Sequence, residues 1–291
     1  MYYGLIIISV ILFGACFKSQ DIYREIQGKA NGIKITLQYS LICSVAGLVS
    51  LILINGLKFE FTLFTFIMAM LAALNSFGFS FCSFKALGKI NLSLYSLYSM
   101  LGGMVLPFFQ GIIFYGESIT LAKIICVIFI TAALLITVNK GERKNGAVYY
   151  AGVFILNGMS GVLSKLFSSA EFAKTSAESY SIWICICSIL ISSAALLIFF
   201  RNTEKDEKLR KIPATIGIGV FSGVANKIAN LFLVIALMHV DASVQYPMVT
   251  GGVMIVSTAI CFFGKNKPSK KEILSVAVAF LGMLALFVIP V

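Results

Sequence analysis

Long apolar runs, each ended by charges, Gly or Pro, follow one another along the whole chain. About 20 mostly apolar residues suffice for a helix that crosses a bilayer, and open sheets cannot cross lipid. The runs also lack the alternation of a barrel strand, so the pattern predicts an all-α membrane protein with ten transmembrane helices. The predicted spans are 2–17, 32–54, 61–84, 91–115, 120–138, 147–168, 176–200, 213–238, 241–264 and 270–290.

Local start signals support several of these edges. Asn91, Thr120 and Asp241 are side chains that favour the N-cap position of a helix. Ser269 followed by Glu272 has the spacing of a capping box.

The composition excludes a soluble protein. Hydrophobic residues make up 59% of the 291 positions and charged residues 12%, against ~45–50% and ~25% in soluble domains. The net charge of +11 does not indicate nucleic acid, because the basic residues are scattered in loops and form no stripe with aromatics. All seven cysteines lie in apolar runs, and no metal or cofactor site is expected.

The distribution of basic residues predicts an orientation. Eighteen of the 23 Lys and Arg residues lie in the loops after the odd-numbered spans, four lie on the opposite side, and Lys227 lies within a span. Cytoplasmic loops are enriched in Lys and Arg, so the count places both termini outside. We expect a multi-pass protein of the plasma membrane, of prokaryotic type.

The chain also resembles itself. A shift of 147 places Tyr2-Tyr3 on Tyr149-Tyr150 and Lys18 on Lys165, and a shift of 148 places Gly116 on Gly264. These matches predict two five-helix repeats, 1–140 and 141–291. Since five is odd, the second repeat would be inverted in the bilayer, which is the architecture of secondary transporters with a site near the midplane.

One segment carries a family resemblance. The string FKALGKINLSLYSLYSMLGGMVLPFFQGIIFYGESIT at 84–120 has a small-residue helix, Pro107, Gly116-Glu117 and a following apolar helix. It resembles the EamA-type module of the drug/metabolite transporter superfamily, and residues 234–269 resemble it more loosely, with Lys265 after Gly264. The resemblance implies a ten-helix carrier of small molecules whose first, third, fourth, sixth, eighth and ninth spans line a cavity. It also implies that both termini are cytoplasmic, against the charge count. We expect the protein to be a monomer or a homodimer.

Four spans carry polar residues gathered on one face, which lipid would penalise. Small and hydroxyl residues in such stripes can serve as contacts between helices, whereas tyrosines suit a ligand pocket. The candidate substrate-binding residues in these stripes are Lys227, Asn226, Asn230, Tyr95, Tyr98, Ser99, Tyr246, Thr250 and Asn157.

Lys227 is the sharpest single feature. It lies 11 residues, about 16 Å at 1.5 Å per residue, from the end of its predicted span. An ionisable group at that depth indicates a functional site. A structural ammonium satisfied by carbonyls and by Asn226 or Asn230 is the alternative.

Two further patterns bear on mechanism. No Asp or Glu lies deep in a predicted span, so proton–cation exchange through a membrane-embedded glutamate is not expected. Gly102-Gly103 with Pro107, and Pro247 with Gly251-Gly252, predict interrupted helices whose free amides could meet an anionic group.

We therefore expect no enzyme but an alternating-access carrier of a small polar solute, anionic or zwitterionic, with a proton or ion as a possible coupling partner. Two alternatives remain open, a membrane-embedded enzyme and a lipid-carrier flippase. His239 is the single histidine, placed at a loop edge without a carboxylate pair, so it favours a solvated residue over a base.

Overall fold

The computed structural model describes residues 2–27, 33–56, 58, 60–87, 92–136, 147–200, 211–262 and 270–289. These residues form ten α-helices and no strand. The helices are α1 Tyr2–Ile26, α2 Ile33–Ile54, α3 Leu63–Leu87, α4 Leu92–Tyr115, α5 Leu121–Ile136, α6 Ala147–Ser169, α7 Ala177–Phe200, α8 Ile212–Leu237, α9 Ala242–Phe262 and α10 Lys270–Val288.

The predicted helix edges agree with the structure to within three residues, with one exception. The first span was predicted to end at residue 17, but α1 continues to Ile26. Residues 18–26 include Lys18, Asp21 and Arg24. Apolar content therefore ends before the helix does, because backbone hydrogen bonds can continue where a hydrophobic run stops.

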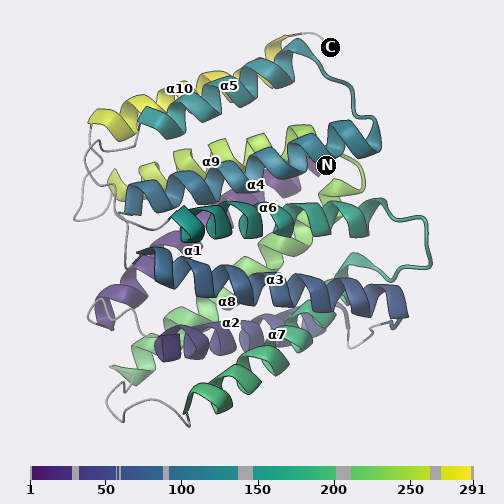
Figure 1. Ribbon diagram of the computed structural model, residues 1–291, viewed down its shortest axis with the longest axis vertical. Helices are drawn as coiled ribbons and strands as arrows, with labels where there is room; N and C mark the ends of the chain where they lie inside the picture. Colours follow the sequence, from purple (N-terminus) through teal and green to yellow (C-terminus); the bar gives the residue numbers. More distant parts are fainter. Residues whose placement is uncertain are drawn as a thin grey trace.

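Successive helices run in opposite directions across the bundle (Figure 1). The helix ends at Ile26, Leu87, Ile136, Phe200 and Phe262 gather at one end. Both chain termini lie at the other end (Figure 1). We refer to these as the lysine-rich end and the terminal end, since the loops that hold most Lys and Arg follow the first set.

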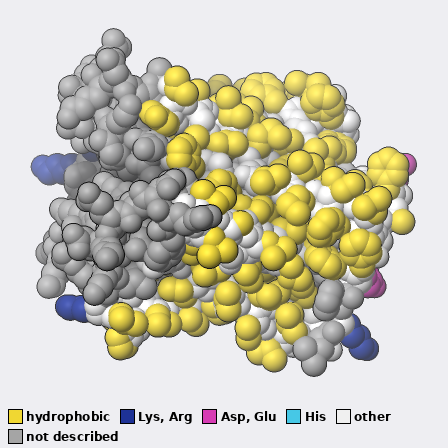
Figure 2. Space-filling view, turned by 60° about the horizontal axis from the view of Figure 1, so that its bottom comes forward, with side chains coloured by type: hydrophobic (Ala, Val, Ile, Leu, Met, Phe, Trp, Pro, Cys, Tyr) yellow, Lys and Arg dark blue, Asp and Glu magenta, His cyan; other side chains and the backbone are white. Residues whose placement is uncertain are grey.

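The outside of the bundle is apolar. Figure 2 shows hydrophobic side chains over most of the described surface in that view, with charged groups toward its margins. Within the described part of the chain, six helices are long and apolar enough to cross a membrane, and α1, α5 and α10 contain shorter apolar stretches. Large apolar side chains such as Phe114, 78% exposed, and Leu53, 72% exposed, face outward. A surface of this kind suits lipid rather than water.

The packing of the helices repeats with a period of five. The contact of α1 with α8 corresponds to that of α6 with α3, and α4 with α6 corresponds to α9 with α1. The contacts of α2 with α8 and of α7 with α3 correspond in the same way. In the pairs α2–α7, α4–α9 and α5–α10, the two helices are themselves five positions apart, so each pair is its own counterpart. The two halves of the chain are thus interleaved rather than placed side by side.

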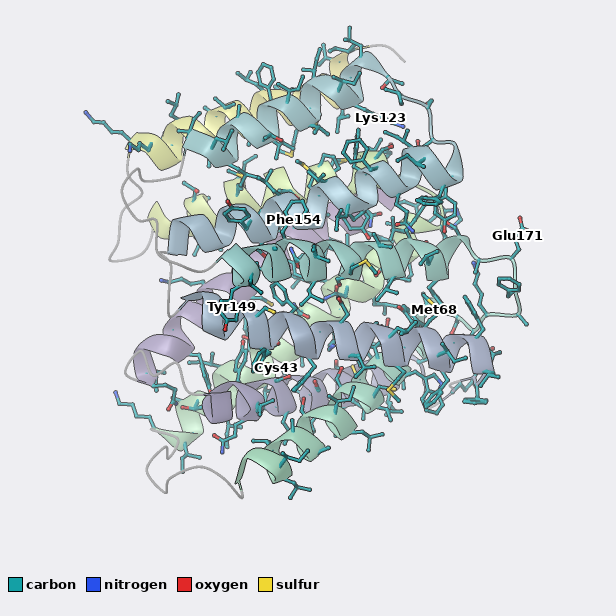
Figure 3. The ribbon with its side chains drawn as sticks, viewed as in Figure 1. Cys43, Met68, Lys123, Tyr149, Phe154 and Glu171 are labelled. Carbon is teal, nitrogen blue, oxygen red and sulfur yellow. The ribbon has the colours of Figure 1, made fainter. Side chains whose placement is uncertain are left out.

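Glycines allow the closest approaches between helices. A Cβ on Gly102 of α4 would overlap the backbone of Phe154 on α6, and one on Gly223 of α8 would overlap the backbone of Cys43 on α2. Phe154 lies where α4 and α6 meet, and Cys43 lies on α2 (Figure 3). In lipid the hydrophobic effect does not hold helices together, so small residues stabilise such crossings by allowing close van der Waals packing.

The expectation of interrupted helices is wrong. Helix α4 continues through Pro107, and α9 continues through Pro247. Neighbouring helices stabilise a proline inside a membrane helix, so these segments remain regular. Gly102 instead serves the contact with α6, and Gly251 packs against Met283 of α10.

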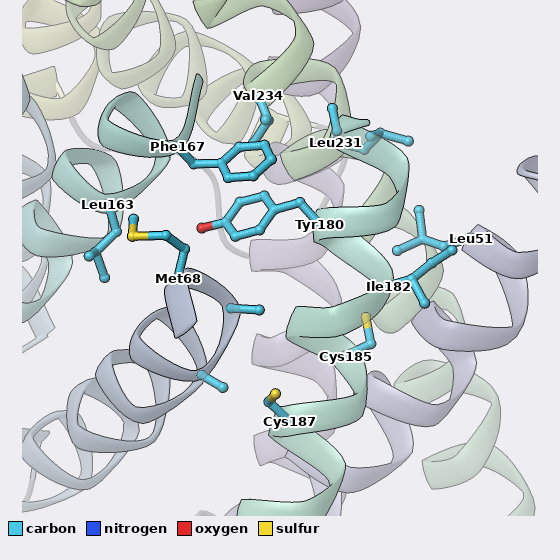
Figure 4. Close-up of a cluster of buried hydrophobic side chains, with 13 residues drawn as sticks. Leu51, Met68, Leu163, Phe167, Tyr180, Ile182, Cys185, Cys187, Leu231 and Val234 are labelled. Carbon is cyan, nitrogen blue, oxygen red and sulfur yellow. The ribbon is translucent and has the colours of Figure 1, made fainter. Parts of the chain in front are cut away.

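The largest core cluster joins α2, α3, α6, α7 and α8. Its centre is the Phe167–Tyr180 pair, whose rings stack with centroids 3.8 Å apart at an angle of 10°. Figure 4 shows the two rings face to face, with Met68 and Leu163 beside the tyrosine hydroxyl.

Candidate functional site

A central cavity of about 420 Å³ lies among seven helices near the middle of the bundle. Small-molecule sites have volumes from ~300 Å³ upward. The six helices that the family resemblance implies, α1, α3, α4, α6, α8 and α9, all contribute lining residues, and α7 does so as well. In the described part of the chain, α2, α5 and α10 contribute none.

Seven of the nine predicted site residues line this cavity. They are Ser99 on α4, Asn157 on α6, Asn226, Lys227 and Asn230 on α8, and Tyr246 and Thr250 on α9. Tyr98 lies on α4 but is not among the lining residues, and the side chain of Tyr95 lies outside the described residues. The structure therefore brings together most of the polar stripes, while their contact with a substrate stays a prediction.

Lys227 occupies the middle of α8, which extends from Ile212 to Leu237. Its aliphatic stem lies against Gly47 of α2, where any larger side chain would overlap it. Its charge lies close enough to the thiols of Cys43 and Cys185 to interact with both. Among the described residues, the Lys227 ammonium has no ion-pair or hydrogen-bond partner. The predicted structural role, an ammonium satisfied by Asn226 or Asn230, therefore finds no support in the described contacts.

The amides near Lys227 are bonded to one another and to backbone. Asn230 donates from Nδ2 to the carbonyl of Asn226 at 2.8 Å and to its Oδ1 at 3.0 Å. On the facing helices, Asn157 donates to the carbonyl of Ser99 at 2.6 Å. Asn157 therefore joins α6 to α4, the helix-contact role that the sequence left open.

Three of the hydroxyls that line the cavity in the described structure donate to carbonyls within the protein. Ser164 donates to Ser160 O at 3.0 Å within α6, and Ser181 donates to Ala177 O at 2.8 Å within α7. The Tyr246 hydroxyl donates to Gly161 O at 2.9 Å and joins α9 to α6.

Tyr180 is a lining residue that the sequence analysis missed. Its side chain is fully buried, and its hydroxyl has no hydrogen-bond partner within the described structure. The signal was present: the run Glu178-Ser179-Tyr180-Ser181 is polar at the start of an otherwise apolar helix. This run spreads around α7 instead of following one face, so it does not appear as a stripe.

A buried ion pair lies at the terminal end of the bundle. Glu117, in the loop between α4 and α5, binds Lys165 of α6 at 2.8 Å, with side chains only 5% and 8% exposed respectively. The same carboxylate accepts hydrogen bonds from the N–H groups of Ala242 at 3.0 Å and Ser243 at 2.9 Å. Glu117 therefore caps the N-terminus of α9, where its charge also meets the helix dipole.

Burial by itself would raise the pKa of the Glu117 carboxyl. The hydrogen bonds from Lys165, Ser243 and the Ala242 N–H outweigh that effect and hold the pKa below its ordinary value. The group is thus a carboxylate at neutral pH, and it balances the charge of Lys165.

Asp241 occupies the predicted N-cap position of α9, but its carboxylate is used elsewhere. It binds the Lys123 ammonium at 2.9 Å, and Lys123 also donates to Ser118 O at 2.9 Å. The prediction for Thr120 is confirmed, because Lys123 N donates to its hydroxyl at 3.3 Å. Asn91 and the Ser269 capping box lie outside the described residues.

A smaller hollow of about 280 Å³ lies beside the Lys123–Asp241 pair at the terminal end. Its charges already neutralise each other, so it offers no free group for a ligand. Lys123 lies toward the same end of the bundle as Glu171 (Figure 3). The predicted loop position of His239 is confirmed: it follows α8, is exposed, and stacks on Tyr2 with ring centroids 3.9 Å apart.

The sequence matches no family model and no curated protein. A solved structure described only as the crystal structure of a protein superposes on this chain with a TM-score of 0.70. The two share 16% sequence identity, over 96% of this chain and 95% of the other. The likeness shows that the fold occurs in a solved protein over nearly its whole length.

Proposed function

We propose that this protein is a secondary transporter that moves a small polar metabolite, anionic or zwitterionic, across the plasma membrane by alternating access. The observation that carries the proposal is the central cavity, which lies among helices of both halves within a bundle that is apolar outside. Among the described residues, its charged lining residue Lys227 has no ion-pair or hydrogen-bond partner. An unpaired charge at mid-bundle is expensive and is retained where a ligand or ion binds it.

The proposal includes ten membrane crossings and two inverted repeats of the EamA type. The packing pattern with a period of five supports it, because most of the main contacts are kept when each helix is exchanged for the one five positions later. The contact of α9 with α10 is the exception, since α4 and α5 contact each other only weakly. Helices α1 and α6 run in opposite directions, as an inverted pair requires (Figure 1). The repeats would be 1–140 and 141–291, in agreement with the shifted matches of Lys18 with Lys165 and Gly116 with Gly264.

Alternating access also requires a closure that can open. The Glu117–Lys165 pair joins the α4–α5 loop to α6, and Glu117 joins that loop to α9. These elements belong to different halves, so their separation would open the terminal end without unfolding a helix. Rigid halves that rock about a shared site are the usual mechanism in such folds.

Transport is tested with purified full-length protein in sealed vesicles. Candidate solutes are first selected as ligands that raise the thermal unfolding temperature, because binding to the folded state stabilises it. We expect at least one ligand to enter the vesicles in a protein-dependent manner, and Lys227→Met to lower that flux at least tenfold. Lys58→Met is the matched control, because Lys58 is exposed and lies outside the cavity.

If no stabilising ligand crosses the membrane, the proposal fails. Unchanged flux of every ligand in Lys227→Met would remove Lys227 from the mechanism. Product formation by the protein in detergent, where no compartments exist, would indicate a membrane-embedded enzyme instead.

A further inference from the structure

The charge balance of the central cavity is one-sided. Lys227 is the one charged side chain among the described lining residues. Glu117, whose charge interacts with the lining residue Tyr246, has a buried carboxylate that already binds Lys165 and two N–H groups of α9. A ligand carboxylate therefore has a partner in the cavity, whereas a ligand ammonium would have no counter-charge in the described lining.

The hydroxyls of the cavity do not supply the missing counter-charge. The hydroxyl protons of Ser164, Ser181 and Tyr246 are donated to carbonyls, so towards a ligand these oxygens can act only as neutral acceptors. A buried charge is stabilised most by an opposite charge, which offsets its loss of hydration. The Lys227 ammonium therefore makes the described lining favour a ligand with net negative charge.

The polarity of the cavity also changes along α8. Asn226, Lys227 and Asn230 are followed within two turns by the apolar lining residues Leu233, Val234 and Leu237. Other helices extend this apolar wall. The apolar residues that they contribute include Phe13, Phe79, Ile184, Val249 and Val253.

We infer that the cavity binds a monoanionic organic acid with a hydrocarbon body, its acid group at the Lys227 ammonium and its body against the apolar wall. The inference rests on the proposed function, in that it names the class of cargo, and it favours acids over the corresponding zwitterions. A single positive charge matches a monoanion. Burial of an apolar body against the apolar wall would favour binding, whereas a small, fully polar ion would leave this wall without a contact.

The test compares ligands that share a body and differ in charge. One series is 3-phenylpropionate, phenylalanine and phenethylamine, and the other is hexanoate, norleucine and hexylamine. Binding is measured on the purified full chain in detergent at neutral pH by calorimetry. We expect the acid of at least one series to bind at least tenfold more tightly than its amino acid, and the amine to bind more weakly still.

Variants at Lys227 test the cause of this preference. Lys227→Met should bring acid and amino acid to within about threefold of each other, and Lys227→Arg should retain a preference for the acid because it retains the charge. Lys58→Met should behave as the wild type. The thermal unfolding temperature of each variant is first measured without ligand, which identifies a misfolded variant. If Lys227→Met is misfolded, the test rests on Lys227→Arg, which should keep the preference for the acid.

The inference is overturned if an amino acid binds as tightly as its acid, if no acid of either series binds, or if the preference survives in Lys227→Met. Failure of the proposed function is distinguishable, because it is read from vesicles. Acids that bind with the expected preference but never cross a membrane would leave the ligand class standing and remove transport. Flux of a zwitterion without binding of acids would support transport and overturn the inferred ligand class.

Discussion

The Lys165 ammonium and the Glu117 carboxylate lie 2.8 Å apart with both side chains almost fully buried. Lys165 belongs to the second predicted repeat and Glu117 to the first, so the pair joins the two halves at the terminal end. Removing one member of a buried pair leaves the other charge without compensation, which typically costs about 3–5 kcal/mol.

We therefore expect Glu117→Gln to lower the free energy of unfolding by about 3 kcal/mol, measured by denaturation in detergent. The double variant Glu117→Gln with Lys165→Met should recover part of this loss, because no charge is then left unpaired. Glu171→Gln is the matched control, since Glu171 is exposed in the loop before α7. A loss in the double variant equal to the sum of the two single losses would show that the pair is not coupled.

The same carboxylate predicts a dependence of stability on pH. The pKa of Glu117 is lower in the folded protein than its ordinary value of 4.5, so the folded state binds protons less readily than the unfolded state. Its contribution to stability is fully present above pH 4.5 and is lost as the pH falls through the lowered folded pKa. The difference in unfolding temperature between wild type and Glu117→Gln should therefore narrow steadily below pH 4.5. A constant difference down to strongly acidic pH would contradict the assignment.

The close approach of α4 to α6 predicts a contrast between two glycines. A Cβ at Gly102 would overlap the backbone of Phe154, which cannot move as a flexible side chain can. Gly102→Ala should therefore destabilise the protein by about 1–3 kcal/mol. Gly217→Ala in α8 is the matched control, because a Cβ there would meet no atom within 4 Å beyond its own stretch of helix. That change should be neutral or stabilising by up to about 1 kcal/mol in thermal unfolding.

The helices and most of the cavity could be predicted from the sequence, because lipid forces apolar residues outward and leaves polar stripes facing inward. Lys227 and Asn157 belong to such stripes, and both line the cavity. The Glu117–Lys165 pair could not be found this way, since 48 residues separate its members and each lies near a helix end, where charges usually meet water. The Asp241–Lys123 ion pair could not be predicted either. A carboxylate at a helix start can serve as a cap or in an ion pair, and the sequence does not distinguish the two roles.

Gly47 offers a way to move Lys227 without removing its charge. The lysine stem lies directly against this glycine, so Gly47→Ala should displace the ammonium while the helices remain packed. If the ammonium holds the acid group of the cargo, the variant should weaken binding of the preferred acid at least threefold, measured by calorimetry. Gly78→Ala in α3 is the control, since its added methyl would make ordinary contact with Leu156 at 3.5 Å. Unchanged acid binding in Gly47→Ala would show that the position of the Lys227 stem is unimportant.

Tyr180 on α7 and Tyr246 on α9 both line the central cavity and should respond oppositely to loss of the hydroxyl. The Tyr180 hydroxyl is buried with no partner among the described residues, so its desolvation is uncompensated and Tyr180→Phe should leave stability unchanged or raise it by about 1 kcal/mol. Tyr246 donates to Gly161 O at 2.9 Å, so Tyr246→Phe should lower stability by about 0.5–1.5 kcal/mol. The two variants are matched in chemistry and are compared by unfolding in the same detergent. Equal losses in both would mean that the Tyr180 hydroxyl has a partner, for which a bound water between α3, α6 and α7 is the simplest candidate, given its place beside Met68 and Leu163 (Figure 4).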